Sequence, residues 1–176
     1  MKSNNFASCL TDYITSELSL RPNEKEFVIF SDGCGSQNRS SVISNALLHT
    51  AITRDITIVQ TYLERGHTQM ECDSVHSAVE SERRNKCVYT PGGYISIIQN
   101  ARKREVLASG ENQVATKLPY VVKYVTHDFF NDYSGLGYYS SIRPGLKAGD
   151  PQVTDIRSLQ YLPEGVIRYK LRMKDD

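Results

Sequence analysis

Several features that would restrict the function of this chain are missing from its sequence. The 176 residues contain no tryptophan and only four cysteines, which are widely spaced and include no Cys-x-x-Cys pair. Neither a zinc ribbon nor a disulfide framework is therefore indicated, and we expect an intracellular protein with reduced thiols. No apolar stretch reaches membrane-spanning length and no secretory signal is recognisable, so we expect no membrane partner.

An excess of one charge is also missing. The chain has 21 Lys and Arg against 20 Asp and Glu, a net charge of +1. Bulk charge therefore favours no class of partner, and any contact with nucleic acid must depend on local groups of cations. Apolar residues make up 39% of the chain, which is enough to form the core of one domain, or of one lobe with an appendage.

Hydrophobic periodicity predicts alternating helices and strands in the first half of the chain. Helical spacing of apolar residues predicts helices over residues 6–18, 40–53 and 73–84. Short apolar runs, the second rich in β-branched residues, predict strands over residues 27–30 and 56–63. This alternation favours a parallel sheet with helices packed on it, so we predict an α/β fold.

The pattern changes near residue 87. We expect four further features there: a helix over 94–102, a strand over 120–125, a Gly- and Tyr-rich loop over 131–150, and a hairpin formed by 153–162 and 166–173. The sequence thus predicts two domains, an α/β core over residues 1–86 and a C-terminal, β-containing appendage over residues 87–176.

Asp32 is the first candidate site residue. It lies two residues after the last residue of the strand predicted over residues 27–30, and in open parallel sheets catalytic groups gather at the carboxyl ends of strands. Asp-Gly is also an ordinary turn pair, so a purely structural role is an alternative. The adjacent Gly33-x-Gly35 lacks the remaining residues of a dinucleotide fingerprint or a phosphate-binding loop.

A second candidate cluster lies after the next predicted strand, and its members are His67, Glu71, Cys72, Asp73, His76 and Glu80. Helical spacing places Asp73, His76 and Glu80 on one face. Carboxylates with an imidazole suit Mg²⁺ or Mn²⁺, whereas Zn²⁺ would recruit the cysteine and histidines. In the structural alternative, Asp73 caps a helix, and His76 and Glu80 form a surface pair.

The last predicted strand supplies a group of cations. Arg168, Lys170, Arg172 and Lys174 alternate with apolar residues, and a period of two places all four on one face. A second basic group lies at residues 102–104. Either group could hold phosphates, although such alternation is also typical of a solvated strand face.

Two longer phrases, residues 30–39 (Phe-Ser-Asp-Gly-Cys-Gly-Ser-Gln-Asn-Arg) and residues 66–80, resemble an uncharacterised, transposon-associated domain family that recurs in animal genomes. Shorter phrases extend the resemblance over nearly the whole chain, at residues 89–91, 127–130, 142–145 and 150–151. That family is similar in layout to the ribonuclease H-like superfamily of DDE transposases and integrases.

The resemblance implies a metal-dependent polynucleotidyl transferase or nuclease. In that superfamily three carboxylates hold two divalent ions, Mg²⁺ or Mn²⁺, which activate water or a 3′-hydroxyl. Asp32 matches the second carboxylate and Asp73 the third, with Glu71 and Glu80 as rivals, and Asp73-x-x-His76 resembles a transposase motif. The implied catalytic residues are Asp32, Asp73 and Glu80, and the implied metal ligands are Asp32, Asp73 and His76.

The same layout begins with three strands, the first of which carries the first carboxylate, and no strand is predicted before residue 27. The resemblance therefore implies an N-terminally truncated ribonuclease H-like core over residues 1–86, which we expect to be inactive by itself. DNA is the expected partner and the nucleus a candidate compartment.

Two other functions remain open. One is a non-catalytic module, domesticated from a transposon, that binds nucleic acid or protein through Arg168, Lys170, Arg172 and Lys174. The other is a metal-dependent phosphoesterase, suggested by Gly66-His67-Thr68.

Overall fold

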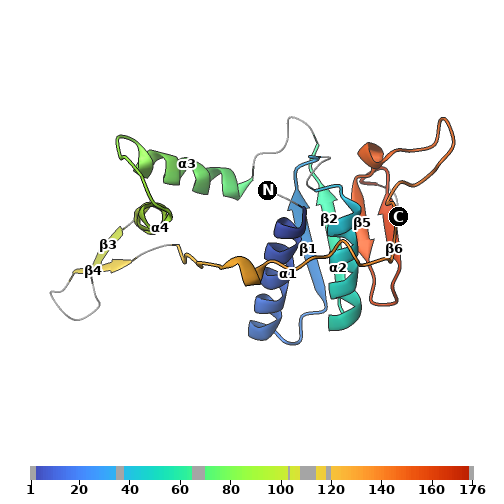
Figure 1. Ribbon diagram of the computed structural model, residues 1–176, viewed down its shortest axis with the longest axis horizontal. Helices are drawn as coiled ribbons and strands as arrows, with labels where there is room; N and C mark the ends of the chain where they lie inside the picture. The colour runs from blue at the N-terminus through green and yellow to red at the C-terminus, as the bar shows by residue number, and fades with distance from the viewer. Residues whose placement is uncertain are drawn as a thin grey trace. The chain divides into compact units, whose positions relative to one another are not determined.

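The computed structural model describes residues 3–34, 38–64, 70–102, 104–107, 114–117 and 120–174. The chain forms two compact units, residues 1–68 with 126–176, and residues 69–125. Each unit is described by itself below, with the elements labelled as in Figure 1.

A four-stranded mixed sheet forms the centre of the first unit. Its strands, in spatial order, are β1 (Glu26–Ser31), β2 (Thr57–Tyr62), β5 (Ser158–Tyr161) and β6 (Ile167–Lys170). β1 and β2 are parallel, whereas β5 is antiparallel to β2 and β6 is antiparallel to β5. The predicted α/β class and the predicted parallel pair are therefore confirmed.

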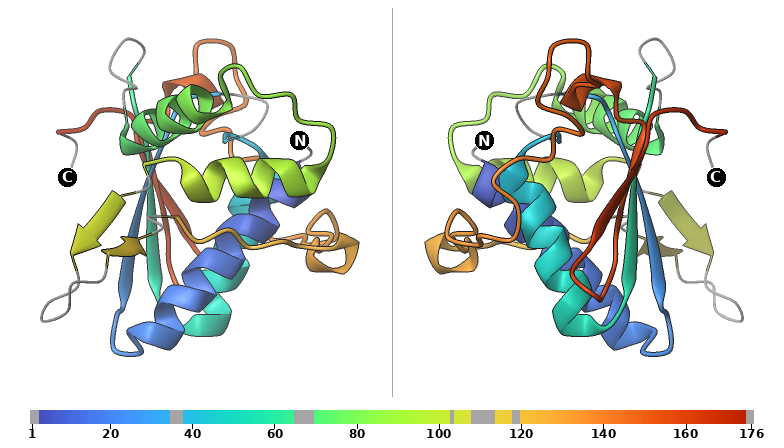
Figure 2. Two further views of the ribbon diagram at one scale, coloured as in Figure 1. Left: turned by 90° about the vertical axis from the view of Figure 1, so that its left-hand side faces the viewer. Right: turned by 90° about the vertical axis from the view of Figure 1, so that its right-hand side faces the viewer.

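Two helices, α1 (Ser3–Leu20) and α2 (Ser41–Arg54), lie on the same face of this sheet, as the two views of Figure 2 show. Apolar side chains of both helices and of the sheet form one core, including Ile14, Leu48 and Ile58. Of the two serines, Ser40 and Ser41, that the sequence offers as a cap for α2, Ser40 has this role, because its Oγ accepts a hydrogen bond of 3.3 Å from the Ile43 amide. In the described part of the chain, no helix is both long and apolar enough to cross a membrane.

A polar network is buried between α2 and the sheet. Tyr161 Oη lies 2.8 Å from Gln60 Oε1, and Tyr62 Oη lies 3.2 Å from the same oxygen. Ser44 Oγ and the Asn38 carbonyl complete the network, at 3.2 Å from Tyr161 Oη and 3.0 Å from Tyr62 Oη. A single glutamine thus satisfies two buried phenols, as the cost of unpaired buried hydroxyls requires.

The loop that leads to β5 runs across the helices. Asn45 of α2 holds it through Nδ2, which donates to the carbonyls of Leu136 (2.7 Å) and Tyr139 (2.9 Å). Asn45 Oδ1 accepts from the Tyr139 amide at 3.1 Å. The predicted loop over residues 131–150 is confirmed, and this anchoring directs the chain back to the sheet.

The second unit contains two helices and a hairpin, namely α3 (Glu71–Arg83), α4 (Pro91–Asn100), β3 (Arg104–Leu107) and β4 (Val114–Lys117). α3 has no buried residue. α4 begins three residues before its predicted start, because Thr90 caps it and Pro91 occupies its first turn. The antiparallel pair of β3 and β4 was not predicted.

Three expectations for the C-terminal half need correction. The predicted hairpin forms, but it extends the sheet of the N-terminal half, so it is no appendage. The boundary expected at residue 86 also differs from the division into units. Residues 120–125 form no strand, and Val121 there is 99% exposed, because a β-prone segment needs a strand edge to pair with.

Candidate functional site

Asp32 lies directly after β1, at the carboxyl end of a strand that is parallel to its neighbour, as predicted. Its Oδ1 accepts hydrogen bonds from the Cys34 amide (3.3 Å) and from Asn38 Nδ2. Asn38 Nδ2 also lies 3.2 Å from the Asp32 carbonyl. The exposed carboxylate therefore closes the turn between β1 and α2.

The candidate residues of α3 lie in the second unit, and each is exposed. Asp73 Oδ2 accepts from the Met70 amide at 2.8 Å, so Asp73 has the capping role. Glu80 forms an ion pair of 3.0 Å with Arg83, not with His76. Glu71 begins α3, and His67 lies outside the described residues.

Asp32 is therefore in one unit while Asp73, His76 and Glu80 are in the other, and their meeting around a metal stays a prediction. Among the residues that the structure describes, no three His, Cys, Asp or Glu side chains are grouped to hold a metal ion.

A hollow of about 620 Å³ lies at the carboxyl ends of β1 and β2. Its lining is Asp32, Gly33, Cys34, Arg39, Leu63, Thr154 and Arg157. One carboxylate and two guanidinium groups do not fit a divalent cation, because the arginines repel it. The side chains that the first unit contributes here fit an anion instead.

Arg39, Thr154 and Arg157 are residues of this hollow that the sequence does not mark as candidates, and Arg39 is the most buried part of the site. Only 7% of Arg39 is exposed. Its Nη1 donates to the carbonyls of Val153 (2.6 Å) and Ile156 (2.7 Å), and its guanidinium carbon lies 3.9 Å from the centre of the Tyr62 ring. Burial lowers the pKa of Arg39 and raises the pKa of Tyr62 to about 12.

The sheet face opposite the helices carries the predicted cations. No helix of the first unit, in its described part, covers this face (Figure 2). The strand register aligns two rows of residues across it, Val28–Val59–Gln160–Arg168 and Phe30–Thr61–Ser158–Lys170. We call these eight residues the open sheet face. Its β1 edge is apolar, with Val28 54% and Phe30 56% exposed, and its β6 edge is cationic.

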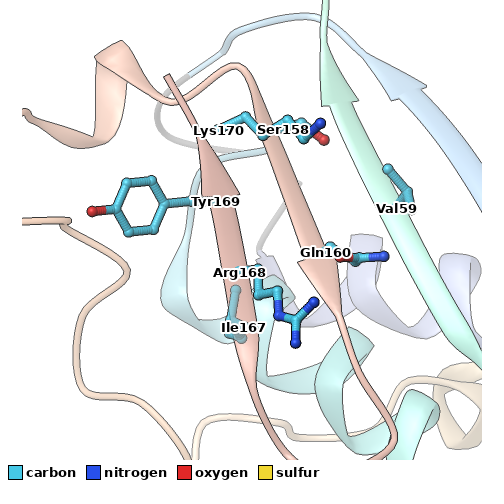
Figure 3. A pocket seen from close by; sticks show the side chains of 7 residues that line it. All are labelled: Val59, Ser158, Gln160, Ile167, Arg168, Tyr169 and Lys170. Atoms are coloured by element: carbon cyan, nitrogen blue, oxygen red, sulfur yellow. The ribbon is translucent and has the colours of Figure 1, made fainter. Parts of the chain in front are cut away.

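The β6 side of the open sheet face is hollowed, with a volume of about 660 Å³. Figure 3 shows Arg168 and Gln160 close together on neighbouring strands, with Tyr169 pointing the other way. None of the seven lining residues is a carboxylate, whereas two of them, Arg168 and Lys170, are cations. This side of the face therefore favours an anionic partner.

The predicted set of four cations on one strand is wrong in part. β6 ends at Lys170, so the period of two places Arg168 and Lys170 alone on the open sheet face. Arg172 and Lys174 follow in a bend and a turn. In the second basic group, Arg102 Nη2 donates to the Ser74 carbonyl at 3.0 Å, and Lys103 lies outside the described residues.

Comparisons of the chain with models of protein families, with curated proteins and with solved structures find no match. The site is therefore interpreted from its own geometry.

Proposed function

We propose that this chain is a transposase-derived, ribonuclease H-like domain that binds DNA through its open sheet face. The observation that carries this proposal is the hollow beside β6, where Arg168 and Lys170 stand with no carboxylate in the lining. Phosphate groups are the anions of DNA, and binding through them releases counterions, which gives affinity without sequence preference.

The apolar edge of the same face gives the proposal its second part. Neighbouring strands lie about 4.8 Å apart, so the β1 edge and the β6 edge are separated by about 14 Å. Phe30 on β1 offers an exposed ring on which a base can stack, while the cations of β6 hold the backbone. This arrangement favours single-stranded DNA over duplex DNA.

Support for the ribonuclease H-like ancestry comes from the order of the elements. The first unit begins with α1, β1, α2 and β2; β1 and β2 are parallel, and Asp32 follows β1. In the layout of DDE transposases and integrases, the strand that ends at the second carboxylate is likewise followed by a helix and a further strand. The C-terminal hairpin is an addition to this order.

The test is a measurement of DNA binding by fluorescence anisotropy over a range of salt concentrations, with single-stranded and duplex oligonucleotides of one sequence. In the double variant Arg168→Ala/Lys170→Ala we expect weaker binding and a salt slope (log Kd against log salt) smaller by about 1.4 for single strands, since two phosphate contacts are lost.

The matched control is Arg143→Ala/Lys147→Ala, which removes one Arg and one Lys from exposed positions of the loop that runs over the helices. We expect the control to bind DNA as the unsubstituted chain does. Equal losses in both double variants would mean that net charge alone governs binding. DNA binding that neither variant changes would overturn the proposal.

The second candidate is the metal-dependent nuclease. Its favouring observation is the position of Asp32 at the carboxyl end of a parallel strand. Mg²⁺ or Mn²⁺ would need further ligands from α3, namely Asp73 with His76 or Glu80. If Asp32→Asn and Asp73→Asn each abolish Mn²⁺ binding and DNA nicking, the nuclease is favoured; Mn²⁺ binding unchanged by both substitutions would exclude these ligands.

A further inference from the structure

The guanidinium group of Arg39 has a buried nitrogen, Nε, without a described partner. Arg39 is 93% buried, since 7% of it is exposed, and its Nη1 is occupied by the carbonyls of Val153 and Ile156. Its Nε has no hydrogen-bond partner among the described residues, and no acceptor for Nη2 is found among them either. An unsatisfied buried donor of a charged group is costly, so a ligand is expected to accept from it.

The edge of the guanidinium group formed by Nε and Nη2 faces the hollow at the carboxyl ends of β1 and β2. A methyl group placed on Gly33 would lie 3.5 Å from Arg39 Nη2 and 3.7 Å from Nε, so the Nε–Nη2 edge lies over the glycine that lines the hollow. Arg157 and Thr154 line the hollow as well, and they add a second cation and a hydroxyl donor.

The charges around the edge are mixed, because the guanidinium groups of Arg39 and Arg157 lie among three carboxylates. Arg157 lowers the pKa of Arg39 further and Asp155 opposes that effect, while Asp32 is the carboxylate in the lining. Asp32 Oδ1 is engaged by Asn38, and Glu64 lies 3.8 Å from Arg157 at the surface. The 14-residue helix α2 begins at Ser41, two residues after Arg39, and a helix N-terminus adds positive potential.

We propose that this hollow binds a phosphate group, which accepts two parallel hydrogen bonds from Nε and Nη2 of Arg39 and interacts with Arg157. A phosphate oxygen pair matches the fork of an arginine edge. Ser31 Oγ and Asn38 Oδ1 are buried in the same segment and also lack a described partner, so the segment holds more polar atoms than the described residues satisfy. The phosphate belongs either to a small phosphate compound or to the 5′ end of a nucleic acid.

This site does not rest on DNA binding by the open sheet face. Its lining comes from the strand ends and from the segment before β5, and it shares no residue with the hollow beside β6. The two proposals can therefore fail separately.

The experiment is a titration of the full chain with inorganic phosphate, with chloride at equal ionic strength as reference. Phosphate binding during this titration is measured by calorimetry and by the ¹H–¹⁵N resonances of the arginine Nε–H groups. We expect saturable phosphate binding with a Kd of about 1 mM or tighter, and a downfield shift of one protected Nε–H signal, that of Arg39.

Three variants locate the site without removing the buried arginine. Gly33→Ala adds a methyl group at contact distance from the Arg39 edge and should weaken phosphate binding about tenfold with unchanged thermal stability. Arg157→Gln should weaken it about threefold. Gly135→Ala is the control, because its added methyl group meets nothing within 4 Å, and it should bind phosphate normally.

Absence of saturable binding, or Gly33→Ala and Arg157→Gln both binding as the unsubstituted chain does, would overturn the site. Oligonucleotides with a 5′-phosphate or a 5′-hydroxyl then identify the source. Displacement of inorganic phosphate by the 5′-phosphorylated strand alone supports a nucleic-acid end, and displacement by neither strand supports a small phosphate compound.

Discussion

The two faces of the four-stranded sheet differ in how their polar groups are used. On the helix-covered face, Gln60, Tyr62 and Tyr161 satisfy one another in a closed network. On the open sheet face, Arg168 and Lys170 have no carboxylate beside them in the lining of the hollow. Adjacent residues of the same short strands thus have opposite roles, because successive side chains of a strand point to opposite faces.

The comparison separates stability from binding. Side chains of the covered face contribute to the free energy of unfolding, since they lose contact with water or fill the core. The exposed side chains of the open sheet face, such as Phe30, Arg168 and Lys170, keep contact with water, so their removal should change affinity for a partner and little else. Paired substitutions at adjacent positions of one strand test this division.

The largest effect is expected from a pair on β2. Ile58 is fully buried against the helices, whereas its neighbour Val59 lies on the open sheet face. Ile58→Ala should lower the free energy of unfolding by about 3 kcal/mol through lost burial and a cavity, and Val59→Ala by about 1 kcal/mol or less. Urea denaturation measures both, and equal losses would contradict the division between the faces.

The next pair exchanges a polar group for an apolar one of similar size. Gln60→Leu removes the acceptor that two buried phenols share and should cost about 2 kcal/mol. Gln160→Leu makes the same exchange on the open sheet face and should change stability by less than about 0.5 kcal/mol. Thermal unfolding measures the stability of both variants. If Gln60→Leu is as stable as the unsubstituted chain, the buried network does not contribute to the free energy of unfolding.

Alkaline pH should act on the buried phenols of the covered face. Burial raises the pKa of Tyr62 from 10.0 to about 12, so the folded state keeps a proton that the unfolded state releases above pH 10. Stability is therefore complete below pH 10 and falls as pH rises toward 12, by about 1 to 2 kcal/mol for this group. Tyr62→Phe should reduce the loss, although it costs about 1 kcal/mol at neutral pH.

If Tyr62→Phe loses as much stability between pH 10 and pH 12 as the unsubstituted chain does, another group causes the alkaline loss of stability. Tyr161, whose pKa burial also raises, is the next group to examine, by Tyr161→Phe.

Local patterns were sufficient to predict the elements of the first half of the chain. The strand expected over residues 27–30 is β1, and the strand expected over 56–63 is β2. A short apolar run between polar turns is typical of a buried strand, because it is too short for a helix. The position before the periodic residues of α2 limited the cap to Ser40 or Ser41, and the structure shows that it is Ser40.

Long-range pairing was not predictable in the same way. A period of two shows that residues 166–173 can form a strand but not which strand it joins, so the C-terminal hairpin was assigned to an appendage. The burial of Arg39 was unpredictable for the same reason, because it depends on the Val153 carbonyl, 114 residues further along the chain. In the sequence it is only one more basic residue.

The smallest effect on stability is expected at Phe30. Its ring is 56% exposed on the open sheet face, so Phe30→Ala should leave the free energy of unfolding within about 0.5 kcal/mol of its original value. Its affinity for single-stranded DNA should fall by about 1 kcal/mol, roughly fivefold, because a stacked base loses its support. Phe30→Tyr keeps the ring and should bind normally. If Phe30→Ala instead binds single strands as before while Arg168→Ala/Lys170→Ala does not, the cations bind DNA without the apolar edge. Single strands should then bind no more tightly than duplex DNA.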